Sequence, residues 1–127
     1  MTTNDPLTNL RRICRALPEA TEKPGGRPTF QVRDKTFAMF MDDHHGDGRV
    51  ALWCKGAPGM QDVLIGSGQP RFFIPPYVGH KGWIGVRFDL DEDVDWEEVS
   101  GFVTESYRMT APKRLAAQLE RAEGRVA

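Results

Sequence analysis

The segment 83–90 constrains the fold most, because apolar side chains occupy every second position in it. Such alternation is typical of a β-strand with one face in the protein core. The inward face carries Ile84, Val86, Phe88 and Leu90. The opposite face carries Trp83, Gly85, Arg87 and Asp89. We expect the first face to pack against helices and the second face to meet solvent or a partner.

Two helices are expected to cover the inward face of this strand. The first begins at Asp5 and Pro6, because aspartate caps free amides and proline suits the first helical position. The second begins at Asp95, where the sequence is an aspartate variant of the capping box. From the apolar stripes of these helices, we expect the strand to pack near Leu10 and Phe102.

The other segments predict an antiparallel sheet. Strands are expected over residues 20–23, 28–32, 36–42, 49–55 and 71–74, with a tight turn at Asp34 and Lys35, a short helix over residues 58–65 and a last helix over residues 113–120. Short loops between the early strands favour antiparallel pairing. The order predicts an α+β fold, a two-layer sandwich with helices mainly on one face of the sheet. The tail from Glu123 is expected to fray.

The composition is that of one globular domain, which we expect to span residues 1–127. The 17 cationic and 18 acidic side chains give a net charge of −1, which argues against a strong nucleic-acid binder. No apolar run approaches the roughly 20 residues of a membrane span, and no signal-peptide pattern opens the chain. We expect a cytoplasmic protein with no membrane partner, in which Cys14 and Cys54 are free thiols.

The connection over residues 71–83 is a candidate binding loop. Its prolines stiffen the backbone and its glycines allow turns. On nucleic acid, Arg71 and Lys81 would contact phosphates, Tyr77 or Trp83 would stack on a base, and His80 would add a hydrogen bond. The alternative is a structural corner in which the aromatic side chains only close the core.

Further cations could extend this surface. Lys113 and Arg114 begin a helix, where the helix dipole disfavours them unless an anion binds there. The alternative is that both simply face water. The full basic face would consist of Arg27, Arg33, Arg71, Lys81, Arg87, Lys113 and Arg114.

No catalytic residue, metal site or cofactor is expected. His44 and His45 lie among aspartates, but the cluster lacks regular ligand spacing and is better interpreted as a polar hairpin loop. The acidic block over residues 91–98 is interpreted as capping and solvation. Cys54 would need a nearby base to act as a nucleophile, and the sequence indicates none.

Several spaced motifs resemble the MmcQ/YjbR family of small bacterial proteins. They occupy residues 16–22, 26–30, 37–39, 71–73, 76–83, 94–96, 106–108 and 111–114. The resemblance covers nearly the whole chain. It implies a fold similar to the CyaY-like and secretion-chaperone-like folds, of the α-β(3)-α-β(2)-α type. It also implies DNA binding through a double-wing motif, the role by which family members are often described.

Three classes of function are consistent with the sequence. The first is a non-enzymatic nucleic-acid-binding module that uses the basic face. The second is a protein-binding adaptor that uses the open sheet face and the aromatic loop. The third is a small-ligand or enzyme function at the same loop. Contiguous positive charge would favour the first, an exposed apolar patch the second, and a deep pocket the third.

Overall fold

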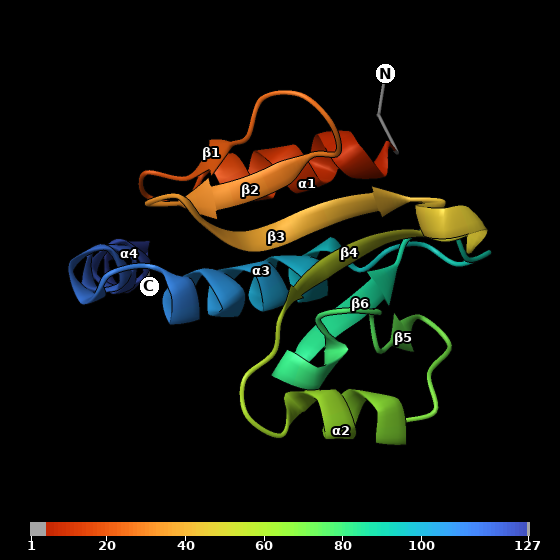
Figure 1. Cartoon of the computed structure of the whole chain (residues 1–127). Coiled ribbons are helices and arrows are strands. Elements are labelled where there is room, and N and C mark those ends of the chain that lie inside the picture. Colours follow the sequence, from red (N-terminus) through yellow and green to blue (C-terminus); the bar gives the residue numbers. More distant parts are fainter. Residues whose placement is uncertain (1–4, 127) are drawn as a thin grey trace.

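An antiparallel sheet of six strands in the order β1-β2-β3-β4-β6-β5 forms one layer of the protein (Figure 1). This computed structural model describes residues 5–126, with side chains through residue 121. The elements are α1 (Pro6–Arg15), β1 (Thr21–Glu22), β2 (Thr29–Val32), β3 (Lys35–Asp42), η1 (His44–Gly46), β4 (Val50–Lys55), α2 (Met60–Gly66), β5 (Phe72–Phe73), η2 (Gly79–Lys81), β6 (Trp83–Arg87), α3 (Trp96–Thr110) and α4 (Lys113–Val126). The predicted α+β sandwich is confirmed. No helix in the described part of the chain is long and apolar enough to span a membrane.

The main core lies between the sheet and helices α1 and α3. Ile84, Val86 and Phe88 are at most 7% exposed and belong to one apolar cluster with Leu10, against which Phe102 packs. The predicted core assignment is therefore confirmed. The strand itself is shorter than predicted, since β6 ends at Arg87.

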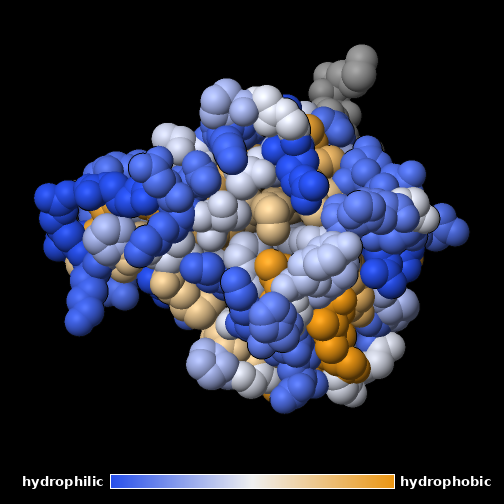
Figure 2. Space-filling model, viewed as in Figure 1, coloured by the Kyte–Doolittle hydropathy of each residue, from blue (hydrophilic) through white to orange (hydrophobic). Residues whose placement is uncertain are grey.

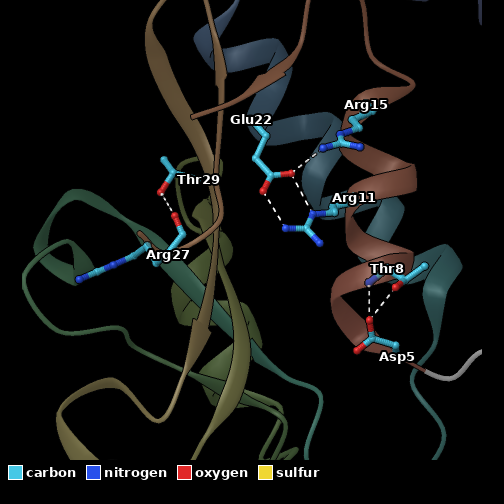
Figure 3. A network of polar contacts seen from close by, with 7 residues as sticks. All are labelled: Asp5, Thr8, Arg11, Arg15, Glu22, Arg27 and Thr29. Atoms are coloured by element: carbon cyan, nitrogen blue, oxygen red, sulfur yellow. Dashed lines mark hydrogen bonds and ion pairs between the residues drawn. The ribbon is translucent and has the colours of Figure 1, made fainter. Parts of the chain in front are cut away.

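Helix starts follow the predicted capping pattern. The Asp5 carboxylate accepts a hydrogen bond from the Thr8 amide, as Figure 3 shows, and Asp95 caps α3 by accepting from the Glu98 amide. At the other end of the chain, α4 continues to Val126, and fraying of the tail from Glu123 stays a prediction. Ala127 lies outside the described residues.

The β2–β3 hairpin turns at Arg33 and Asp34, one residue before the predicted position. Both residues have positive φ angles, +51° and +64°. This is the geometry of a two-residue type I′ turn, whose twist matches that of the flanking strands. Lys35 is therefore the first residue of β3 and lies beside the end of the turn.

Ser106 of α3 is inserted into the sheet at one end of the β3–β4 pair. Its buried hydroxyl donates to the Phe37 carbonyl oxygen at 2.6 Å and accepts from the Lys55 amide at 2.9 Å. The hydroxyl thus replaces a missing ladder bond between the two strands. This contact fixes the C-terminal half of α3 against the end of the sheet that carries Lys55.

The opposite face of β6 is covered within the protein itself, contrary to the expectation that it meets solvent or a partner. Trp83 is 7% exposed and packs in a second apolar cluster with Met41, Trp53 and Phe73. The Phe73 ring lies directly over Gly85, where an added Cβ would come within 2.4 Å of a ring atom. Figure 2 shows this side of the molecule as mainly hydrophilic, with an apolar patch beside α2.

Candidate nucleic-acid interface

Strand pairing brings lysines from distant parts of the sequence to one end of the sheet. Ala38 pairs with Cys54, and Lys55 pairs with Trp83. Consequently β3 begins, β4 ends and β6 begins at this same end. Lys35, Lys55 and Lys81 are the lysines at these positions.

The three lysines are close enough to influence one another. The pKa of Lys55 is lowered first by burial and then by the positive charges of Lys35 and Lys81. None of the three forms an ion pair with a carboxylate in the described part of the chain. Like charges held together without partners raise the local positive potential.

Helix α4 adds two cations at this end. Lys113 and Arg114 are exposed in its first turn. Arg114 is near Glu19, whose pKa it helps to lower, but the Glu19 carboxylate is bound mainly by Arg33 at 2.7 and 3.2 Å. We call this set the basic end; it consists of Lys35, Lys55, Lys81, Lys113 and Arg114.

The loop that carries Lys81 is held rigidly. The Gln61 side-chain amide of α2 donates to the carbonyl oxygens of Gly79 and Trp83, both at 2.8 Å. Gly82 has a φ of +88°, a conformation that glycine adopts without steric cost. His80 and Lys81 are therefore presented on a fixed turn, and both are exposed.

Trp83 cannot stack on a base in this conformation, because its ring is buried in the second apolar cluster. The prediction that it serves as a stacking platform is therefore wrong, and the structural alternative holds for this residue. Tyr77 differs, since it is 71% exposed and has a strained φ of +67°. Its ring contacts His44 and His45 at centroid distances of 5.9 and 6.3 Å.

Arg71 and Arg87 are engaged within the protein, which corrects their assignment as phosphate contacts. Arg71 donates twice to Glu98, both at 2.9 Å, and stacks on the Phe72 ring at 4.3 Å. The Glu98 carboxylate therefore binds Arg71 and does not complete a capping box at the start of α3. Arg87 donates twice to Asp89, at 3.1 and 2.7 Å. Both arginines also lie at the end of the sheet opposite the basic end, where the antiparallel pairing of β5 with β6 places them side by side.

Arg27 also lies at the far end of the sheet. It precedes β2, and its guanidinium contacts the Met41 sulfur at 3.8 Å near His44. Figure 3 shows its side chain extending away from α1, where Arg11 and Arg15 bind Glu22. The residues predicted for the binding loop and the basic face therefore do not form one surface. Lys81, Lys113 and Arg114, with the neighbouring His80, are exposed at the basic end. Arg33 and Trp83 also lie at this end of the sheet, but Arg33 is bound by Glu19 and Trp83 is buried.

Sequence reasoning missed Lys35 and Lys55 as site residues. Their positions at strand ends are visible in the sequence, but the pairing that brings them together is not. The histidine loop is polar and exposed, except that the His44 ring packs on Trp53 at 4.9 Å. Among residues 5–121, no group of three metal-ligating side chains is arranged to hold an ion.

The chain matches known proteins in two comparisons. The family model described as YjbR matches residues 15–109. The crystal structure of Deinococcus radiodurans protein DR2400, with a DUF419 domain, is similar with a TM-score of 0.67 and 20% identity, over 86% of this chain and 81% of that chain. At that identity the similarity concerns the fold. A search of curated proteins finds no match. Since the family model covers most of the chain, the predicted resemblance is confirmed and the protein belongs to the YjbR family.

Proposed function

We propose that this protein binds nucleic acid through the phosphate backbone, using the basic end. The observation that carries the proposal is the gathering of cations from β3, β4 and η2 at one end of the sheet, where Lys35, Lys55 and Lys81 have no carboxylate ion pair among the described residues and α4 adds Lys113 and Arg114. A polyanion would relieve the repulsion among these cations. Phosphate contacts of this kind position a protein on nucleic acid without reading its sequence.

The charge distribution supports this proposal despite the net charge of −1. Several of the remaining arginines are neutralised by nearby carboxylates, as in the pairs Arg71–Glu98 and Arg87–Asp89. Glu92, Asp93 and Asp95 of the acidic block lie with Arg71 and Arg87, and Glu98 is bound by Arg71. A neutral protein can therefore present one positive surface.

The expected interaction is modest and electrostatic. A surface that neutralises about 3–5 phosphates gives a slope of about −3 to −4.5 in log affinity against log salt concentration. His80 lies beside Lys81 and would add a hydrogen bond. Tyr77 and Arg27 lie at the other end of the sheet and are not needed for this mode of binding.

A salt series of fluorescence anisotropy on random duplex DNA tests the proposal. Lys81→Ala and Arg114→Ala should each reduce the magnitude of the slope by about 1. Lys23→Ala is the matched control, because Lys23 is exposed but pairs beside Thr29, away from the basic end. Absence of binding at low salt, or equal effects of all three variants, would refute the proposal.

The alternative adaptor function has one observation in its favour. Val63 and Ile65 of α2 are 66% and 41% exposed, and Ile74 after β5 is 51% exposed. Figure 2 shows apolar surface gathered in this region. An adaptor would lose partner binding in Val63→Asp and keep it in Lys81→Ala, whereas nucleic-acid binding would respond in the opposite way.

A further inference from the structure

A hollow of about 360 Å³ lies between α2 and α3, beside the ends of β4 and β6. Ala57, Met60, Ile84 and Phe102 supply its apolar wall, and the rim carries Lys55, Glu98 and Glu105. Its size falls at the small end of the range for ligand sites, roughly 300–1,000 Å³.

Two glycines line this hollow for different reasons. At Gly56 an added Cβ would lie 2.7 Å from the Gly82 carbonyl oxygen, so backbone packing requires glycine there. At Gly101 an added Cβ would meet no atom within 4 Å. A glycine in the interior of α3 weakens the helix, and no close packing explains it. Its effect is to leave the hollow open.

The charges at the rim are unequal. Glu98 is bound by Arg71 through two hydrogen bonds of 2.9 Å, and Glu105 lies 3.8 Å from Arg108. Lys55 has no carboxylate partner among the described residues, although it is half-buried. Lys35 and Lys81 add to the positive charge beside it. The unpaired charge at the mouth is therefore positive, while the wall is apolar.

We propose that this hollow binds a small molecule with an apolar chain and one anionic head, such as a medium-chain carboxylate or its phosphate monoester counterpart. The chain would pack against Met60, Ile84 and Phe102, and the head would accept hydrogen bonds from the Lys55 ammonium group. Ser106 accepts a hydrogen bond from the Lys55 amide, so the Lys55 side chain extends from a fixed backbone position. This inference does not rest on the proposed nucleic-acid binding.

Octanoate is the first probe, and octyl phosphate is a second probe with a different anionic head group. Octylamine tests the charge preference and acetate tests the need for the chain. Affinity is measured by titration with amide chemical shifts, and the shifts of Gly56 and Gly101 report the location. We expect both octanoate and octyl phosphate to bind. Tighter binding of octyl phosphate than of octanoate would indicate that the natural ligand is a phosphate ester. Octylamine and acetate should bind at least about tenfold more weakly.

Two variants test the assignment of the site. Gly101→Leu fills the hollow and should weaken octanoate binding by about tenfold or more, without harm to the fold because leucine favours helix. Gly66→Leu is the matched control, since Gly66 is helical, exposed and free of neighbours within 4 Å. Lys55→Gln should weaken the binding of both octyl anions by about tenfold and should not weaken the binding of octylamine.

Several results would overturn the inference. These are no octanoate binding to the wild-type protein, binding that survives in Gly101→Leu, or equal binding of octylamine and octanoate. Gly101→Leu should also leave the salt slope for DNA unchanged, whereas Arg114→Ala should change that slope and leave octanoate binding intact. The two proposals can therefore fail separately.

Discussion

The two ends of the sheet both carry cations, but they hold them in different ways. At the basic end, Lys35, Lys55 and Lys81 come together, and none of them forms an ion pair with a carboxylate among the side chains that the structure describes. At the opposite end, Arg27 contacts the Met41 sulfur, and Arg49 lies 4.2 Å from the centre of the Phe73 ring. The first set is available to an external anion. The second set is packed on the protein itself.

This contrast shows why a count of cations does not locate a binding surface. Arg71 and Arg87 are predicted members of the basic face, yet both are bound by carboxylates. Lys55 was not a candidate, yet it lies between two other lysines. What distinguishes the two ends is the set of partners that each cation has in the folded chain.

The largest expected effect concerns the contact that supports the basic end. Ser106→Ala leaves the Phe37 carbonyl and the Lys55 amide without partners, so we expect a loss of about 2–4 kcal/mol in unfolding free energy. Urea unfolding followed by circular dichroism measures it. Thr110→Ala is the control, because it removes only a bond within α3. Equal losses in both variants would contradict the bridging role of Ser106.

The next effect concerns the covered face of the sheet. Gly85→Ala places a methyl group against the Phe73 ring, and we expect a loss of about 1–3 kcal/mol from this overpacking. Gly101→Ala is the contrasting change, since it meets open space and should stabilise α3 by about 0.5–1 kcal/mol. If urea unfolding showed that both variants are stabilised, or that both are destabilised, the packing described for Phe73 would be wrong.

The smallest effect is a pH dependence at the end opposite the basic end. Burial, followed by His45 and Arg27, lowers the pKa of His44. The unfolded chain therefore takes up the proton first, and stability should fall as the pH drops below about 6.5. The urea midpoints of wild type and His44→Gln at pH 7 and pH 5 measure this. If the urea midpoint decreased equally from pH 7 to pH 5 in wild type and in His44→Gln, the pH dependence would belong to other groups.

The sequence predicted the fold well where local patterns decide it. The alternation over residues 83–90 identified the core face, and Asp5 and Asp95 identified the starts of α1 and α3. The sequence did not predict that the opposite face of β6 is buried. Periodicity shows that a strand has two faces, but it does not show that Phe73 and the loop after it fold over the second one.

The candidate site was less predictable because its contacts are long-range. Arg71 and Glu98 are 27 positions apart, and nothing local indicates that they pair. Lys35 and Lys55 meet only because β3 and β4 are antiparallel neighbours. Local chemistry did identify Lys81 correctly as an exposed cation on a rigid turn.

The most direct test compares the two ends in one binding measurement. Lys35→Ala/Lys55→Ala/Lys81→Ala is matched with Arg27→Ala/His45→Ala/Arg49→Ala, and the salt dependence of duplex DNA binding is measured for both and for wild type. We predict that the first variant reduces the magnitude of the slope by about 3, and that the second changes it by less than about 0.5. A larger change in the second variant, or none in either, would contradict nucleic-acid binding at the basic end.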